Sequence, residues 1–170
     1  LPVILTVPPD SAPKTVKEVV DLANSKPGQL NYSSAGLGSA SGLAAEVLKN
    51  VTGTSVVHVP FKGMPEAQTA VLRGDVQLGF TFFSVGGDLI QSGKLRGVAV
   101  TGDKRLAGLP DVPTFREAGL PEFNYDPWFG LMVPSTTPAP LVAKISQDIA
   151  DVLKLADLRE RFEKTGVVLA

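Results

Sequence analysis

Short apolar runs alternate along this chain with segments whose apolar residues recur at helical spacing, and this alternation constrains the fold more than any other feature. Most of the segments are bounded by glycine, proline or serine, as expected for strands and helices joined by turns. Strands that alternate with helices predict an α/β fold in which a mostly parallel sheet is covered by helices. The predicted strands are 1–7, 29–33, 56–59, 76–80 and 95–100, and the predicted helices include 39–50, 66–72 and a short helix that ends at 89–92.

Two segments carry the spacing of a capping box, in which a Ser or Thr and a Glu three residues later each satisfy a free backbone N–H at a helix start. Thr15 and Glu18 have this spacing, and apolar residues then recur on one face until a Pro-Gly pair ends the predicted helix. Thr114 and Glu117 repeat the spacing before Gly119. The first pair therefore predicts a helix that begins next to Thr15.

Toward its C-terminus the chain changes character. Residues 128–133 form an apolar run that predicts a strand, and a cluster of prolines follows it. Leu141, Ile145, Ile149 and Val152 then recur at helical spacing and predict the clearest amphipathic helix of the chain. Both segments would expose apolar surface, which predicts burial against a partner or self-association.

Composition removes several classes of function. The chain has no cysteine, which excludes disulfides, thiolate metal sites and cysteine nucleophiles. Its single histidine, His58, is too few for a histidine metal site or a histidine dyad. The net charge of -1 gives no sign of a nucleic-acid partner. No apolar run approaches the roughly 20 residues of a membrane span. The first residues do not form a signal peptide, so either the protein is cytoplasmic or its leader is missing from this sequence.

The most informative segment is a loop at 31–42, rich in glycine and serine, that follows a strand and opens a helix. Glycines let the backbone approach a ligand, hydroxyls donate hydrogen bonds, and the helix start adds free N–H groups and the positive end of the helix dipole. Together these features suit a phosphate or a carboxylate. The same residues also fit a tight turn with a serine cap and no ligand, so both interpretations stay open on chemistry alone.

Two other interpretations of this loop are weaker. Gly36, Gly38 and Gly42 resemble a dinucleotide-binding fingerprint, but the next strand ends without the acidic residue that would hold the ribose. A hydrolase would need a base beside a loop serine. His58 lies inside a predicted strand, where we expect a packed or structural residue rather than a base.

Two further loops are expected at the same edge of the sheet. Lys62 and Gly63 follow the strand at 56–59 and precede a helix. Lys62 is suited to pair with an anionic ligand, and it equally fits a solvated surface lysine. Residues 81–84 follow the next strand. Because ligands of open α/β sheets bind beyond the carboxyl ends of the strands, we expect the three loops to converge.

An ordered set of motifs runs along nearly the whole chain. It includes Lys26-Pro27-Gly28-Gln29-Leu30-Asn31-Tyr32, Ser34-Ala35-Gly36-Leu37-Gly38-Ser39, Val59-Pro60-Phe61-Lys62-Gly63, Gly74-Asp75-Val76, Ser92-Gly93-Lys94-Leu95-Arg96, Asp111-Val112-Pro113-Thr114 and Trp128-Phe129-Gly130-Leu131. No single motif is decisive, but the ordered set is highly specific. In this set the chain closely resembles the tripartite tricarboxylate transporter receptors, also called the Bug family.

The resemblance implies a periplasmic-binding-protein-like fold of type II with two lobes, in which one strand-to-helix loop from each lobe pinches a carboxylate. Residues 9–125 would then form the second ligand-binding lobe, and residues 1–8 and 126–170 would be partial segments of the first lobe. The sequence departs from the family pattern at Gly42, where the family commonly carries histidine. It also lacks the family's first-lobe binding loop and its usual C-terminal segment.

The function implied by the resemblance is that of a periplasmic receptor. It would capture a small carboxylate (a di- or tricarboxylate, or an amino or aromatic acid) and deliver it to a membrane permease. No catalytic residue, metal, cofactor or nucleic acid is expected, and one lobe alone is expected to bind weakly. The alternative is the ligand-sensing domain of a regulator, and an enzyme comes third. The family's second-lobe site maps to Ser34, Ala35, Gly36, Gly38 and Ser39, with Lys62, Gly63, Phe83 and Ser84 as neighbours.

Overall fold

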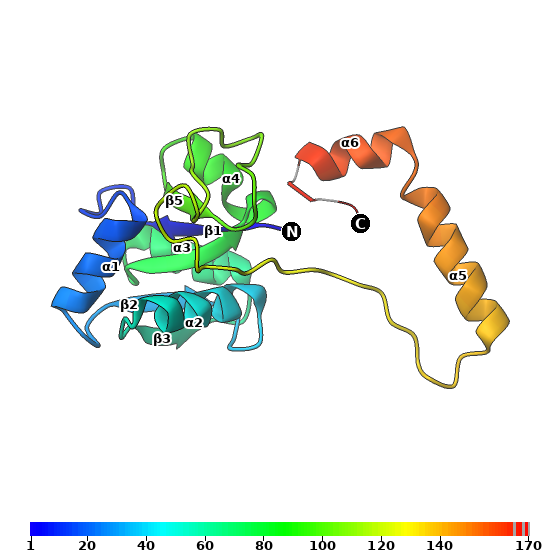
Figure 1. The fold of residues 1–170 in the computed structure, drawn as a ribbon, viewed down its shortest axis with the longest axis horizontal. Helices are drawn as coiled ribbons and strands as arrows, with labels where there is room; N and C mark the ends of the chain where they lie inside the picture. The colour runs from blue at the N-terminus through cyan, green and yellow to red at the C-terminus, as the bar shows by residue number, and fades with distance from the viewer. Residues whose placement is uncertain (165, 168, 170) are drawn as a thin grey trace.

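The computed structural model describes residues 1–164, 166–167 and 169, and its strands and helices alternate through the first hundred residues (Figure 1). The α/β class predicted from this alternation is confirmed. The strands are β1 (Val3–Val7), β2 (Asn31–Ser34), β3 (Val57–Pro60), β4 (Leu78–Phe82) and β5 (Arg96–Val100), and the helices are α1 (Val16–Ser25), α2 (Ala40–Thr52), α3 (Met64–Arg73), α4 (Phe83–Gln91), α5 (Ala139–Val152) and α6 (Ala156–Lys164).

The strands form one sheet in the order β3-β2-β4-β1-β5. β2 pairs in parallel with both β3 and β4, as the alternation predicts. β1 runs antiparallel to both β4 and β5, so the sheet is mixed rather than mostly parallel. Val3, at the start of β1, lies opposite Phe82, at the end of β4. An apolar run has the same pattern in either direction, so the sequence predicts the strand but not its orientation.

β1 comes from residues 1–8, which were expected to belong with the segments of the first lobe. In the structure β1 lies between β4 and β5, and its five residues are buried. Helices pack on both faces of the sheet, so a strand in its interior is apolar on both sides. β1 is therefore part of the same core as β2 and β4.

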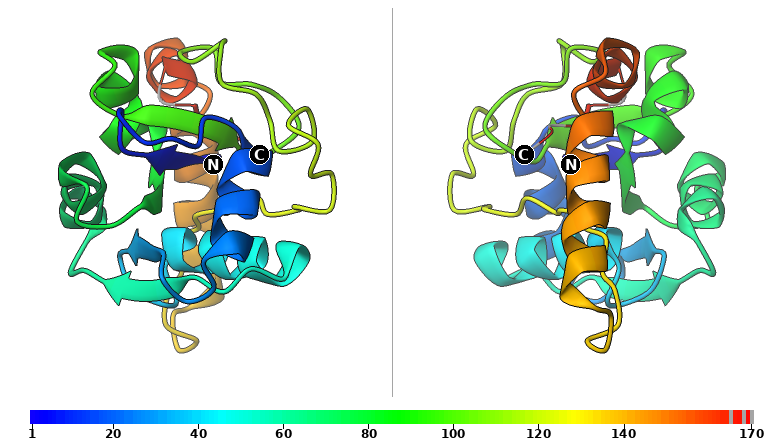
Figure 2. Two further views of the ribbon diagram at one scale, coloured as in Figure 1. Left: turned by 90° about the vertical axis from the view of Figure 1, so that its left-hand side faces the viewer. Right: turned by 90° about the vertical axis from the view of Figure 1, so that its right-hand side faces the viewer.

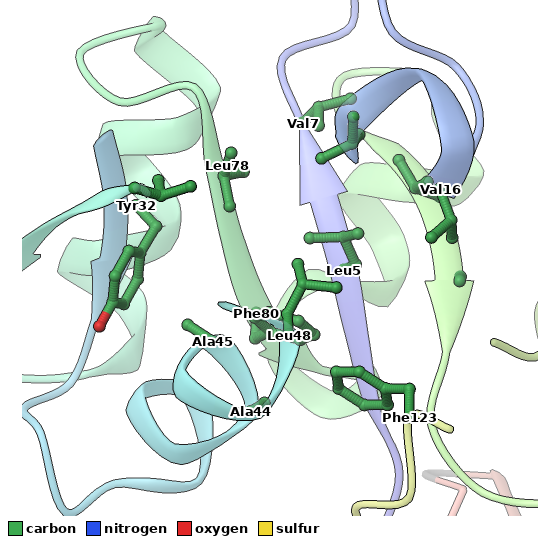
Figure 3. Close-up of a cluster of buried hydrophobic side chains, with 14 of the residues drawn as sticks. Leu5, Val7, Val16, Tyr32, Ala44, Ala45, Leu48, Leu78, Phe80 and Phe123 are labelled. Atoms are coloured by element: carbon green, nitrogen blue, oxygen red, sulfur yellow. The ribbon is translucent and has the colours of Figure 1, made fainter. Parts of the chain in front are cut away.

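The main core lies between the sheet and helices α1 and α2 (Figure 3). Leu5 of β1 lies directly opposite Phe80 of the neighbouring strand β4, and both pack in one cluster with Leu48 of α2. Phe115 and Phe123, which come from the irregular segment after β5, stack with a centroid separation of 3.9 Å. Both rings are buried members of this core cluster.

Both predicted capping boxes form their hydrogen bonds. The Glu18 N–H donates to Thr15 Oγ1 over 3.2 Å, the Thr15 N–H donates to the Glu18 carboxylate, and α1 begins at the next residue. The Thr114 N–H likewise donates to the Glu117 carboxylate over 2.8 Å, and the Glu117 N–H donates to Thr114 Oγ1 over 3.1 Å. Only a turn follows this second box. The capping chemistry is therefore local, whereas continuation into a helix requires an apolar face that packs.

The C-terminal segment departs from the prediction. Residues 128–133 are extended but are not a strand, and no backbone hydrogen bond joins them to any other described residue. No strand lies beside this segment in the described part of the chain, so its β-forming sequence has nothing to pair with. The amphipathic helix is confirmed as α5, but none of its residues is buried, and it stands apart from the sheet (Figure 1). In the right-hand view of Figure 2, α5 is the helix in front. None of the described helices combines the length and apolar character needed to cross a membrane.

Candidate functional site

Three loops meet at one edge of the sheet because β2, β3 and β4 are parallel. Each of these strands leads into a helix, so the N-termini of α2, α3 and α4 lie along the same edge. Figure 1 shows this edge on the side of the sheet that faces α5 and α6. Each helix N-terminus presents backbone N–H groups and the positive end of a dipole. The predicted convergence of loops is therefore present in the fold.

The β2–α2 loop (residues 35–39) takes its shape from glycine and serine. Gly36 has φ +112°, which L side chains rarely adopt. Its carbonyl accepts hydrogen bonds from the Ser39 N–H over 3.1 Å and from Ser39 Oγ over 2.6 Å. Ser39 Oγ in turn accepts from the Gly42 N–H, so Ser39 is also the N-cap of α2. One serine thus closes the loop and starts the helix.

The backbone N–H groups of this loop divide into used and unused donors. The Ala35 N–H donates to Ser41 Oγ over 3.1 Å, and the Gly36 N–H donates to Ser34 Oγ over 3.0 Å. Within the described residues, the N–H groups of Leu37 and Gly38 have no acceptor, and both residues are exposed. Of the residues predicted for the site, Ala35 and Gly36 thus have their donors occupied. The free donors belong to Gly38 and to Leu37, which the prediction missed.

Gly42 lies in the first turn of α2 and is buried under the loop. A Cβ at this position would lie 2.3 Å from the Gly36 carbonyl oxygen and 2.8 Å from that of Leu37. These are backbone atoms, so the loop would have to move to admit any side chain. The absence of a side chain at Gly42 therefore lets the loop lie directly on α2.

Ser34 and His58 meet beneath the loop, a contact that sequence reasoning missed. His58 Nε2 lies 2.6 Å from Ser34 Oγ, and Ser34 is 0% exposed. The His58 ring stacks on Tyr32 with a centroid separation of 4.8 Å. β2 and β3 pair with Tyr32 opposite His58. The contact follows from this register between the strands, which cannot be derived from the sequence alone.

Tyr32 links the strands to α2. Its hydroxyl donates to Glu46 Oε1 over 2.6 Å, and Lys49 Nζ donates to the same carboxylate over 2.8 Å. Burial, together with the hydrogen bond to Glu46, raises the pKa of the Tyr32 hydroxyl well above its ordinary value near 10. The Lys49 and Tyr32 hydrogen bonds lower the pKa of Glu46. The pair is therefore held as a neutral phenol and a carboxylate.

This pairing predicts a pH dependence of stability. Because the folded-state pKa of Tyr32 is raised, its contribution is fully present below the unfolded pKa near 10 and is lost as pH rises further. We expect the free energy of unfolding to fall between about pH 9.5 and 11, and the fall to be smaller in Tyr32→Phe. Urea denaturation across this range measures both. An identical fall in the two proteins would contradict the assignment to Tyr32.

Lys62 and Gly63 lie beside the β2–α2 loop, because the Phe61 N–H donates to the Ser34 carbonyl over 2.8 Å. Lys62 is exposed, and its backbone N–H contacts the Glu66 carboxylate at 3.3 Å. Gly63 is the N-cap of α3 and provides no side chain to cap it. The structure thus brings these two predicted residues together with the glycine loop.

Phe83 and Ser84 begin α4 on the other side of β2. Phe83 packs against a separate core cluster that includes Leu109 and Val112, so its ring is directed into the core. Ser84 is exposed in the first turn of the helix. Of this predicted pair, only Ser84 presents a polar side chain to solvent at this edge. No group of three or more His, Cys, Asp or Glu residues that could hold a metal occurs among the described residues.

Comparison with known proteins gives a consistent result. A family model described as the tripartite tricarboxylate transporter family receptor matches residues 1–169. The chain is 33% identical over 159 residues to the UPF0065 protein in the TAR-I ttuE-ttuC' intergenic region of Agrobacterium vitis, which covers 94% of this chain and 46% of that protein. Both sequence comparisons therefore extend over almost all of the chain.

Three solved structures are similar over nearly the whole chain. MatC from Rhodopseudomonas palustris, solved with bound malate, superposes with a TM-score of 0.90 at 32% identity and covers 98% of this chain and 56% of that one. A second R. palustris protein, solved with adipate, gives 0.89 at 28% identity, with 98% and 56% covered. The periplasmic binding protein BugD gives 0.87 at 30% identity, with 97% and 55% covered.

The chain spans about half the length of these proteins. Within that half, the family model and the superposed fold agree. Of these structures, BugD is described as a periplasmic binding protein, and MatC was solved with bound malate. The chain belongs to the family of tripartite tricarboxylate transporter receptors, the Bug family.

Proposed function

We propose that this chain is the ligand-binding part of a periplasmic receptor that captures a small carboxylate and passes it to the membrane permease of a tripartite transporter. The observation that carries the proposal is the convergence of three helix N-termini beside a loop with two free backbone N–H groups. Such an arrangement stabilises negative charge without requiring a buried cationic side chain. Solvent exposure of Leu37 and Gly38 leaves their N–H groups accessible to a ligand.

A dicarboxylate is the ligand class that these features favour. One carboxylate would accept from the N–H groups of Leu37 and Gly38 and lie near the start of α2. The exposed Lys62 ammonium and the Ser84 hydroxyl, at the starts of α3 and α4, would approach the same anion. Relatives of similar fold were solved with malate and with adipate, which supports a ligand that carries two carboxylates.

We propose that residues 9–125, together with β1, form one lobe and that its partner lobe provides the other half of the site. A carboxylate held by a single loop stays open to water, which weakens charge-assisted hydrogen bonds. We therefore expect this chain alone to bind with a Kd near 1 mM or weaker, which corresponds to about 4 kcal/mol.

Calorimetric titration with malate and adipate, each beside its uncharged diamide, tests the proposal. We expect weak saturable binding of at least one diacid and none of the diamides. The chain should also bind the diacid less tightly at high salt, because exposed charges are screened. Equal binding of acid and amide, or no binding of any small carboxylate, would overturn the proposal.

Replacing Lys62 with glutamine should weaken diacid binding about two- to fivefold, the range expected for an exposed ion pair. The dependence of affinity on salt should also become shallower. Lys26→Gln is the matched control, because Lys26 is an exposed lysine at the end of α1 and away from the convergent loops. Equal losses in the two variants would show that Lys62 acts only through net charge.

The contact between Ser34 and His58 raises a hydrolase as a second candidate, since a serine 2.6 Å from an imidazole has the spacing of a nucleophile and its base. Two observations favour binding instead. Ser34 is fully buried, and its Oγ already accepts the Gly36 N–H. A substrate carbonyl would have no approach to this oxygen. We therefore propose binding without catalysis, in keeping with the similarity to the periplasmic binding protein BugD.

Self-association of the isolated chain is a further expected outcome. Trp128, Leu131 and Met132 are between 74% and 83% exposed on the extended segment, an unusual density of apolar surface. We expect a dimer or larger species by sedimentation at about 50 µM, a concentration at which contacts of about 6 kcal/mol suffice. The double change Trp128→Ser and Leu131→Ser should restore a monomer. Val57→Thr, at an exposed apolar residue elsewhere, should not. A monomeric unmodified chain would contradict this expectation.

A further inference from the structure

We propose that His58 is a positioning residue for the β2–α2 loop, which it orders through Ser34 without contacting the ligand. The proposal rests on the function proposed above, because it assigns the group that holds the ligand loop in shape. It begins from one contact, the 2.6 Å separation of His58 Nε2 and Ser34 Oγ beneath the loop.

The hydrogen bonds of Ser34 determine how this contact works. Its Oγ accepts the Gly36 N–H over 3.0 Å, which fixes the first peptide of the loop. The hydroxyl hydrogen then needs an acceptor, and His58 Nε2 is the one within reach among the described residues. The neutral histidine with its proton on Nδ1 satisfies this arrangement, because Nε2 then carries a lone pair. In this tautomer Ser34 donates to His58 Nε2 while its Oγ accepts the Gly36 N–H.

The His58 ring is itself held in place. It stacks on Tyr32 with an interplanar angle of 23°, and Tyr32 is fixed at its hydroxyl by Glu46 of α2. Lys49 completes the pairing of Glu46. The elements on both sides of the loop, β2 and α2, are therefore joined through these rings to β3. A shift of the imidazole would be transmitted to Ser34 and from there to Gly36.

Loss of the contact between His58 and Ser34 would change the orientation of the peptides that follow Gly36. Gly36 has φ +112°, and the next two residues carry the free N–H groups. If Ser34 rotates away from His58, the Gly36 N–H loses its acceptor and the following peptides are no longer held in one orientation. Loss of preorganisation of this kind weakens binding without removing a ligand contact.

Three variants separate this role from a merely structural one. His58→Phe keeps an aromatic ring on Tyr32 but removes the acceptor, His58→Gln retains an amide acceptor near the position of Nε2, and Ser34→Ala removes the hydroxyl. For malate or adipate, we expect His58→Phe to lower affinity about five- to tenfold and His58→Gln to recover most of it. Because His58 acts through Ser34, the double variant His58→Phe, Ser34→Ala should bind no more weakly than Ser34→Ala alone.

Amide hydrogen exchange in the unliganded chain tests the same coupling independently of binding. The Gly36 amide should exchange about tenfold faster in His58→Phe and in Ser34→Ala than in the unmodified chain, with recovery in His58→Gln. If the unmodified chain binds no carboxylate, the proposed function fails and the Gly36 exchange rates alone judge the positioning claim. Unchanged Gly36 exchange in His58→Phe would overturn it, and so would additive losses of affinity in the double variant.

Discussion

Replacing Gly42 with alanine is expected to displace the β2–α2 loop and to weaken carboxylate binding about tenfold. The new Cβ would lie 2.3 Å from the Gly36 carbonyl oxygen, so the loop must lift away from α2. Hydrogen bonds to charged groups contribute about 1.5–3 kcal/mol each, and misdirecting one of the two free N–H groups accounts for the tenfold loss. The free energy of unfolding should fall by less than the strain of about 1–3 kcal/mol, because the better helix propensity of alanine offsets part of that strain. Calorimetry with malate and urea denaturation measure the two effects.

Gly38→Ala is the matched control for this change. Gly38 belongs to the same loop, its φ is outside the left-handed region, and a Cβ there would meet nothing within 4 Å. We expect its unfolding free energy to stay within about 0.5 kcal/mol of the unmodified chain. If Gly42→Ala bound malate as tightly as the unmodified chain, the contact between loop and helix would be irrelevant to the site.

Phe115→Ala should lower the free energy of unfolding by about 3–5 kcal/mol, a large part of the total stability of a domain of this size. Phe115 is 1% exposed, and the centroid of its ring lies 3.9 Å from that of Phe123 and 6.2 Å from that of Phe80. Truncation removes the ring contacts and leaves a cavity in the main core. Urea denaturation followed by circular dichroism measures the loss.

Phe129→Ala removes the same atoms from an exposed position. Phe129 is 72% exposed and touches the Phe82 ring in a tilted contact at 5.7 Å. We expect its cost to stay below about 1 kcal/mol. A loss of unfolding free energy as small as this in Phe115→Ala would show that the aromatic stack contributes little to the stability of the core.

Periodicity and capping residues predicted most of the fold. The strands at 29–33 and 56–59 and the helix starting at Thr15 agree with the structure to within one or two residues. The direction of β1 and the lack of a pairing strand for residues 128–133 could not be predicted, because both depend on neighbours distant in sequence. β1 lies between β4 and β5 and is antiparallel to both, and the apolar run at 128–133 has no neighbouring strand among the described residues.

The residues that we propose for the site were identified only in part from the sequence. The glycine loop and Lys62 were identified from residue types that follow strand ends, and the structure brings them together. Predicting the contact of His58 with Ser34 would have required the register between β2 and β3. The free N–H of Leu37 could be identified only from the hydrogen bonds of the loop, because the residue type does not show whether a backbone donor has an acceptor. Local chemistry can be read from sequence, whereas the choice of exposed donor depends on the three-dimensional fold.

Backbone amide NMR during titration with malate tests most directly the central claim that a carboxylate binds at the convergent helix N-termini. We predict saturable shifts that are largest at the amides of Leu37 and Gly38, with smaller shifts at the starts of α2, α3 and α4 and none with the diamide of malate. Shifts confined to α5 or to the extended segment at 128–133, or the same pattern with the diamide, would contradict the account.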